Sequence, residues 1–232
     1  MSRPVVTLHF AQSLDGRIGL GKERERAILS SEAGVTCAHD ARRRHDAVLI
    51  GIETLLHDDP RLNARLADGP QPLRVVLDSA LRLPRNARLL EPDPSAGQVW
   101  VFGSAARATS SRRRELEAAG VHVQLTSPDA SGRVELKQVL EALAQRGVER
   151  LLVEGGAKVL TSFLQARLAQ RAEVEIAPLW LGATATPALG DLGVTELGQA
   201  LRLAAPKLEW LGSSLLLRGD VMYPEGARDE LA

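Results

Sequence analysis

The sequence predicts an α/β fold with a mostly parallel central sheet, and three observations support this prediction. Short runs rich in β-branched and aliphatic residues recur along the chain, as is typical of strands covered on both faces. Several of these runs are separated by segments whose apolar residues repeat at helical spacing. The 232 residues, 44% of them hydrophobic, can bury one sizeable core, so we expect a single domain over 1–232, with its core in about 4–221.

Eight segments have the composition of strands. They are 4–11, 46–50, 73–78, 98–102, 121–125, 149–153, 173–179 and 214–221. A longer connection separates the last two, so an antiparallel arrangement is expected in this C-terminal part. Segments 15–26 and 91–97 are expected to be loops because of their glycine, proline and charged residues.

Three helices are expected between these strands. Residues 31–44 begin with serine and glutamate and end in three arginines, which suits the two ends of a helix dipole. Residues 133–146 carry apolar side chains at helical spacing, with Ser131 as the expected N-cap and Gly147 as the stop. Residues 157–168 show the same apolar spacing.

Charge and cysteine content exclude several classes of protein. Lys and Arg together number 29, as do Asp and Glu, so neither nucleic acid nor a membrane is an expected partner. The single cysteine rules out a disulfide framework and a cysteine-based metal site, and the five histidines show no metal-ligand spacing. No stretch approaches the ~18 apolar residues of a membrane span. We therefore expect a cytoplasmic protein that holds no metal.

Small or acidic residues follow four of the predicted strands. These residues are Gly51 and Thr54, Asp78 and Ser79, Gly103 and Ser104, and Glu154 with Gly155 and Gly156. Ligands of open α/β sheets bind outside the carboxyl ends of the strands. Ordinary turns use the same residue types, so one such strand end is ambiguous. Four of them together favour a ligand-binding edge.

The stretch LLVEGGAKVL, residues 151–160, places two glycines at the start of an expected helix. Free N–H groups and the positive end of the helix dipole attract an anion there, and the absence of Cβ atoms lets a pyrophosphate approach closely. The pattern is neither G-x-G-x-x-G nor a P-loop, which argues against those two nucleotide-binding folds. Nucleotide binding by another fold and a plain turn both remain open.

A second charged group lies in GIETLLHDDPRLNAR, residues 51–65. Asp58 and Asp59 are adjacent, and neighbouring residues of an extended chain point to opposite sides, so the two do not easily serve one site. A turn or a helix start is the ordinary alternative. Arg65 and Arg42 are candidates for a bidentate pair with a substrate phosphate.

Taken in order, several segments resemble one known family. They are AQSLDGRIG (11–19), RRRHDAVLIGIETLLHDDPRLNAR (42–65), PLRVVLDS (72–79), LLVEGGAKVLTSFL (151–164) and IAPLWLG (176–182). The family is the reductase domain of the bacterial bifunctional riboflavin-biosynthesis deaminase–reductase, together with the related stand-alone pyrimidine reductases. The resemblance implies a dihydrofolate-reductase-like α/β fold, with helices flanking the mostly parallel sheet and an antiparallel C-terminal part.

The resemblance also implies an activity. A phosphoribosylaminopyrimidine would be reduced by NADPH to its ribitylamino form, with hydride transfer to C1′ of the opened ribose. The protein would align the reactants and supply charge. A homodimer is expected, with the apolar C-terminal stretches LEWLG and SLLLRGDV in its interface.

The resemblance assigns roles to individual residues. The cofactor-binding set is Gln12, Ser13, Thr54, Asp58, Ser79, Gly155, Gly156, Ala157, Lys158, Val159, Leu160, Thr161 and Ser162. The substrate-binding set is Arg42, Leu62, Arg65 and Glu154, and the catalytic candidates are Glu154, Asp58 and His9. Arg82 is a candidate partner, with Ser79, for the adenosine 2′-phosphate, and Arg107 is the next candidate.

Two positions depart from the family pattern. Bifunctional members often carry lysine where this chain has His9, and tryptophan where it has Ala27. His9 is therefore either a packed strand residue or a catalytic one. Two other functions stay open: a reductase of the same fold that acts on a pterin or another carbonyl or imine, and a catalytically silent NADP-binding dimer.

Overall fold

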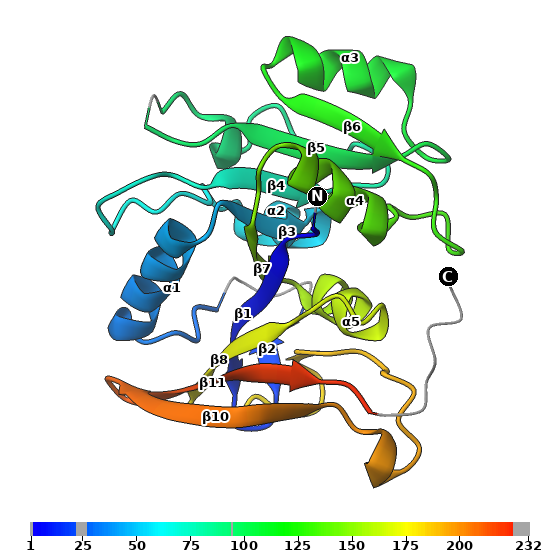
Figure 1. Ribbon diagram of the computed structural model, residues 1–232. Coiled ribbons are helices and arrows are strands. Elements are labelled where there is room, and N and C mark those ends of the chain that lie inside the picture. Colours follow the sequence, from blue (N-terminus) through cyan, green and yellow to red (C-terminus); the bar gives the residue numbers. More distant parts are fainter. Residues whose placement is uncertain (1, 22–26, 94, 225–232) are drawn as a thin grey trace.

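A nine-stranded sheet forms the centre of the molecule in the computed structural model, which describes residues 2–21, 27–93 and 95–224 (Figure 1). Its strand order is β10-β11-β8-β1-β7-β3-β4-β5-β6, and β2 and β9 form a small second sheet. The strands are β1 (Val5–Ser13), β2 (Arg17–Gly19), β3 (Ala47–Gly51), β4 (Leu73–Leu77), β5 (Val99–Ser104), β6 (His122–Thr126), β7 (Arg150–Gly155), β8 (Arg171–Ala177), β9 (Thr186–Pro187), β10 (Arg202–Leu211) and β11 (Ser214–Met222).

All neighbouring strands from β8 to β6 run parallel, whereas β11 pairs antiparallel with both β8 and β10. The predicted parallel sheet with an antiparallel C-terminal part is therefore confirmed. The helices are α1 (Glu32–Arg44), α2 (Ile52–Asp58), α3 (Ser110–Ala118), α4 (Leu136–Gln145) and α5 (Ala157–Gln165), with short 3₁₀ turns at Arg88–Leu90 and Leu197–Gln199.

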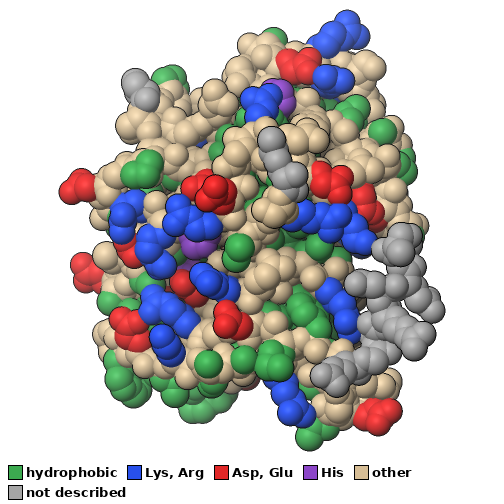
Figure 2. Space-filling view, in the orientation of Figure 1, with side chains coloured by type: hydrophobic (Ala, Val, Ile, Leu, Met, Phe, Trp, Pro, Cys, Tyr) green, Lys and Arg blue, Asp and Glu red, His purple; other side chains and the backbone are tan. Residues whose placement is uncertain are grey.

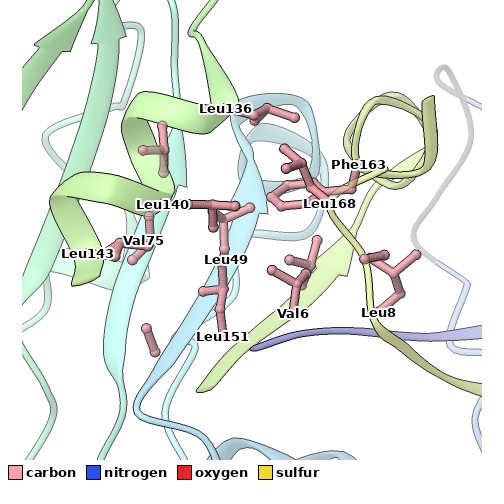
Figure 3. Close-up of a cluster of buried hydrophobic side chains, with 14 of the residues drawn as sticks. Val6, Leu8, Leu49, Val75, Leu136, Leu140, Leu143, Leu151, Phe163 and Leu168 are labelled. Atoms are coloured by element: carbon pink, nitrogen blue, oxygen red, sulfur yellow. The ribbon is translucent and has the colours of Figure 1, made fainter. Parts of the chain in front are cut away.

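Two apolar clusters sandwich the sheet. One lies between the sheet and α4 and α5, and contains Leu8, Leu140 and Phe163 (Figure 3). The other joins the opposite face to α2 and α3 and includes Leu55 and Leu116. Both faces of the parallel strands are thus covered, which explains why the strands read as nearly continuous apolar runs.

Several predicted boundaries need correction. The helix expected over 133–146 begins only at Leu136, because Val134 forms a bridge with Pro128. Ser131 does not cap it; the Glu135 side chain accepts from the backbone N–H of Lys137 instead. The helix expected over 157–168 ends at Gln165, and the strand expected over 173–179 is β8, two residues earlier.

Other expectations for these elements hold. Ser31 caps α1, since its side chain accepts from the backbone N–H of Gly34. Gly147 follows α4 with a φ of +80°, a left-handed conformation that glycine adopts easily. The helices α2 and α3 and the strand β10 were not predicted from the sequence. The segment 15–26, expected to be a loop, contains the short strand β2, and its residues 22–26 lie outside the described part.

No helix of the described residues is long and apolar enough to span a bilayer. Within the same residues, no group of three or more His, Cys, Asp or Glu side chains is arranged to hold a metal ion.

Candidate active site

A cavity of about 220 Å³ opens where β1, β7 and β3 reach their carboxyl ends. Its wall combines apolar side chains with a few polar ones, as expected of a small-molecule site. The lining residues are Phe10, Ala11, Ile18, Ala27, Ile28, Leu29, Ser30, Thr54, Asp58, Glu154, Gly156 and Leu160. The segment 27–30 leads directly into α1, so one wall of the cavity is continuous with that helix.

The glycine pair forms the junction between β7 and α5. Gly155 has a φ of +103° and is joined to Gly156 by a cis peptide bond. Gly156 is the N-cap of α5 but has no side chain to satisfy the first N–H groups of the helix, which leaves them available to an anion. The Gly156 N–H donates to Thr54 Oγ1 at 2.7 Å, and a Cβ on Gly156 would lie 2.9 Å from that oxygen. The backbone is therefore closely packed at the cavity floor.

Glu154, one residue before the glycines, makes a two-pronged ion pair with Arg42 of α1. Arg42 Nε and Nη2 donate to the two carboxylate oxygens at 2.6 and 2.7 Å, and Nη1 donates to the carbonyl of Asn63 at 3.0 Å. Burial alone would raise the pKa of Glu154, but the charge and hydrogen bonds of Arg42 outweigh it and hold this pKa below its usual value. The carboxylate is thus ionised and fixed in direction.

His39 lies beside this pair and was not singled out from the sequence. It is 3% exposed, and its Nδ1 has no hydrogen-bond partner within the described residues. Burial, followed by the charges of Arg42 and Arg65, lowers the pKa of His39 to about 4. The imidazole is therefore neutral at neutral pH. Arg65 is more exposed and donates to the side chain of Asn63 at 3.3 Å.

His9 belongs to a row of polar and acidic side chains on the face of the sheet that α1 covers. Its Nδ1 lies 3.3 Å from Glu173 Oε2 on the neighbouring strand β8. The β1–β7 register pairs Leu8 with Val153, which brings Glu154 next to His9 on the other side. Burial raises the pKa of Glu173, but the hydrogen bond and charge of His9, with Arg218 and Arg44, bring it down to about 2. A catalytic role for His9 stays a prediction.

The other predicted cofactor residues divide into two groups. Thr54, Asp58, Gly156 and Leu160 line the cavity. Ser13 is fully buried, donates to Asp15 and accepts from the N–H of Arg17, so it stabilises the turn between β1 and β2. Gln12 precedes it on β1, outside the cavity lining.

The remaining members of the predicted sets lie around this cavity or in the core. Ala157, Lys158, Val159, Thr161 and Ser162 belong to α5. Thr161 Oγ1 donates to the carbonyl of Ala157 and accepts from the N–H of Gly190. Leu62 is buried in the second apolar cluster, beyond the lining of the cavity.

The strand ends of β4 and β5 fold into turns. Asp78 is fully buried and accepts from the N–H of Leu83, and burial raises its pKa. Ser104 Oγ donates to the carbonyl of Gly132, and Ser79 Oγ accepts from the N–H of Val134. Of the four strand ends noted in the sequence, only those of β3 and β7 contribute to the cavity lining. The binding roles of Ser79, Arg82 and Arg107 stay predictions.

Sequence reasoning also missed the segment 27–30 and the side chains of Phe10 and Ile18 as cavity walls. One signal was available: 27–30 precedes a predicted helix start at the carboxyl edge of the sheet. The chain position of Phe10 next to His9 gave no comparable signal, because alternate residues of a strand face opposite sides.

Comparisons with known proteins agree with this architecture. The sequence model of the RibD C-terminal domain family matches residues 4–217. The 2,5-diamino-6-ribosylamino-4(3H)-pyrimidinone 5′-phosphate reductase of Methanothermobacter thermautotrophicus is 36% identical over 221 residues, covering 93% of this chain and 97% of that protein. The riboflavin biosynthesis protein RibD of Aquifex aeolicus is 32% identical over 216 residues, covering 93% of this chain and 57% of the relative.

Solved structures show the same fold. RibD of Acinetobacter baumannii superposes with a TM-score of 0.80 at 29% identity, over 95% of this chain and 58% of that one. The Saccharomyces riboflavin biosynthesis reductase Rib7 reaches a TM-score of 0.74 at 21% identity, which supports the fold alone. The chain spans only about 57% of the Aquifex RibD and 58% of the Acinetobacter protein. The predicted dihydrofolate-reductase-like architecture is confirmed.

Proposed function

This chain belongs to the RibD C-terminal domain family, and we propose that it reduces a phosphoribosylaminopyrimidine to its ribitylamino form with NADPH, as a step of riboflavin biosynthesis. One observation carries the proposal. Within three residues, an ionised carboxylate faces the cavity and a bare helix start follows it. Such an arrangement can serve a cationic reaction centre and a cofactor pyrophosphate side by side.

The residues at the β7–α5 junction fit a dinucleotide. A Cβ on Gly156 would lie 2.9 Å from Thr54 Oγ1, so the glycine lets Thr54 and the start of α5 come together at the cavity, where the cofactor would bind. The start of α5 would hold the pyrophosphate, and Thr54 and Asp58 would lie along the nicotinamide side. NADPH, when bound, supplies the hydride.

The protein's own part in the reaction is charge and alignment. Opening of the ribose leaves a protonated imine at C1′. Hydride addition forms a C1′–H bond, and the π electrons of the C=N bond become the lone pair of the amine nitrogen. Glu154 stabilises the positive charge before transfer, and Arg42 fixes the direction of that carboxylate. Arg65, which is exposed, would bind the substrate phosphate.

The test is the loss of NADPH absorbance when the purified protein is mixed with the phosphoribosylaminopyrimidine, in its amino and its deaminated form. The proposal expects turnover of one of these and none of a dihydropterin precursor. Tight NADPH binding without turnover of either pyrimidine would instead identify a silent NADP-binding protein. Turnover of the pterin alone would assign another substrate to the same site.

We further propose that NADPH is preferred to NADH, through Ser79 and Arg82 near the adenosine 2′-phosphate. Arg82 is 46% exposed and pairs with Glu53 at 2.6 Å, so it would exchange one anionic partner for another. Charged hydrogen bonds contribute roughly 1.5–3 kcal/mol, which predicts a preference of at least about tenfold. Equal kcat/KM for the two cofactors would refute this assignment. Selectivity that survives Ser79→Ala with Arg82→Ala would move the site, with Arg107 the next candidate.

The β10–β11 hairpin is our proposed homodimer interface. β10 is an edge strand of the sheet, and Trp210 and Leu208 on it are 74% and 65% exposed. Figure 2 shows hydrophobic side chains gathered along this edge. Exposed apolar patches and open strand edges are commonly covered by a second chain. Sedimentation at micromolar concentration should give a dimer for the wild type and a monomer for Trp210→Glu; a monomeric wild type would contradict the interface.

A further inference from the structure

We propose that Glu175 is a positioning residue of the site: it fixes the start of α1, and through α1 it sets one wall of the cavity and the placement of Arg42. This inference rests on the proposed function for its catalytic consequence. Its structural part stands on contacts between β8 and α1 that the reaction does not use directly.

Glu175 lies on β8 and is 3% exposed, beneath the first turn of α1. Its Oε1 accepts from the backbone N–H of Ser31 at 3.0 Å and faces the Ser31 hydroxyl at 3.4 Å. Among the described residues, no Lys, Arg or His forms an ion pair with it. Because a buried carboxylate is costly without compensation, the N–H groups and dipole of α1 are its main counterpart.

Gly34 allows this approach. A Cβ at Gly34 would lie 2.2 and 2.4 Å from the two carboxylate oxygens of Glu175, far inside contact distance. Ser31 Oγ also donates to the carbonyl of Leu211 at 2.8 Å and accepts from the N–H of Gly34 at 3.0 Å. The start of α1 is thus held against β8 and β10 by one short set of contacts.

The contacts of Glu175 with the start of α1 lie next to residues that line the cavity. Glu175 is the register partner of Ala11, which lines the cavity, and Ser31 directly follows the lining segment 27–30. At the other end of the same helix, Arg42 holds Glu154. A helix is nearly rigid over this length, so a displacement at its start moves both the cavity wall and Arg42. Misplacement of about 1 Å at a reacting centre can cost about a hundredfold in rate.

The experiment compares Glu175→Ala and Glu175→Gln by steady-state kinetics, NADPH titration and hydrogen exchange. Glu175→Ala should raise KM for the pyrimidine and lower kcat, each by about tenfold, while NADPH affinity stays within about twofold because α5 is untouched. Glu175→Gln keeps one acceptor for the Ser31 N–H, so it should recover part of both losses. Exchange should rise in peptides that cover 27–35 and stay unchanged in α5. Thr36→Ala, an exposed change on α1, is the matched control.

Gly34→Ala, made in the wild type and in Glu175→Ala, distinguishes a positioning role of Glu175 from a general folding defect. In an ordinary helix, Gly→Ala is stabilising, but Gly34→Ala should lower Tm and activity here because the new Cβ meets Glu175. In the Glu175→Ala background the same substitution should become neutral or stabilising. Gly198→Ala, where a Cβ meets nothing within 4 Å, controls for the substitution itself.

The outcomes separate the two proposals. Unchanged exchange in 27–35, or a Gly34→Ala effect of the same sign in both backgrounds, overturns the positioning role. Equal losses of NADPH affinity and pyrimidine KM would mean general damage and would also overturn it. If the wild type does not turn over the pyrimidine, the proposed function fails, while the exchange and Tm data still decide whether Glu175 anchors α1.

Discussion

The same three strands, β1, β7 and β8, present two very different faces. Toward α4 and α5 they bury only apolar side chains: Val6, Leu8, Leu151, Val153, Ala172 and Val174. Toward α1 they carry mainly charged and polar side chains, namely Thr7, His9, Glu154, Glu173 and Glu175, with Leu152 of β7 as a buried apolar exception. One face resembles an ordinary core, whereas the other is a network of ion pairs and hydrogen bonds that ends at the cavity.

This difference shows how the fold separates stability from chemistry. The apolar face contributes through area removed from water and close packing, which need no particular direction. The polar face contributes little net stability, because the cost of burying charges offsets much of their attraction. Its contribution is to orient the carboxylates. Glu154, for example, is held at the cavity by two hydrogen bonds from Arg42.

The largest effect on stability is expected on the apolar face. Leu8 is 1% exposed, so Leu8→Ala should lower the free energy of unfolding by about 2–5 kcal/mol through lost transfer energy and a residual cavity. The kcat/KM of the folded fraction should change little, since the charged row on the other face is untouched. Urea unfolding with parallel turnover measurements checks this. A small loss of stability together with a large loss of kcat/KM would contradict the claim that the apolar face serves stability and the polar face serves activity.

The next effect concerns the polar face and depends on pH. Burial raises the pKa of Glu173, yet His9, Arg218 and Arg44 bring it to about 2 in the fold, below the ordinary 4.5 of a glutamate. Because the folded pKa is the lower one, Glu173 stabilises the fold above pH ~4.5, and this contribution fades as the pH falls toward ~2. After allowance for screening, Glu173→Gln should cost about 2 kcal/mol at pH 7.

Urea unfolding of wild type and Glu173→Gln between pH 7 and pH 3 measures that difference directly. It should shrink steadily below pH ~4.5. Glu141→Gln is the control, because its pair with Arg3 is half exposed and should be worth less than about 1 kcal/mol at any pH. A Glu173 effect that is constant with pH would show that shape, and not charge, matters at this position.

The smallest of these effects is expected at Thr54 of α2, which lines the cavity. Thr54→Val keeps the shape but leaves the N–H of Gly156 without its acceptor, which should cost about 1 kcal/mol of stability. NADPH affinity should fall about tenfold, because the backbone that receives the pyrophosphate is no longer fixed. Isothermal titration with NADPH tests the second part. Unchanged affinity would place the cofactor away from this contact.

Much of the fold could be predicted from the sequence because its strands are buried on both faces and its best helices have strong apolar spacing. The elements that escaped have weak local signals. β10 is largely exposed and is interrupted by an irregularity between Ala204 and Lys207. α3 buries one side chain, Leu116, in a run of charged residues, and α2 spans only two turns.

The candidate site was predictable in part. Glu154, Gly156 and Thr54 stand at strand ends, which is a local signal, and the structure brings them together. Ser104 carries the same signal, but its hydroxyl donates to the carbonyl of Gly132 in a turn, because residue type alone does not distinguish a ligand edge from turn chemistry. Ser79 also contacts a turn, through the N–H of Val134, and its role toward the cofactor stays a prediction. The row of Glu173, His9 and Glu154 depends on the order and register of three strands, which no local pattern encodes.

The central claim is that Glu154 acts on the substrate while Gly156, two residues further on, admits the cofactor. The most direct test is a pair of variants, Glu154→Gln and Gly156→Val, each assayed by NADPH titration and pyrimidine turnover. We predict near-normal NADPH affinity and a ten- to thousandfold fall in kcat/KM for Glu154→Gln, about 1.4–4 kcal/mol of transition-state stabilisation. Gly156→Val should lose most of its NADPH affinity. Loss of NADPH binding in Glu154→Gln with retention in Gly156→Val would contradict the assignment.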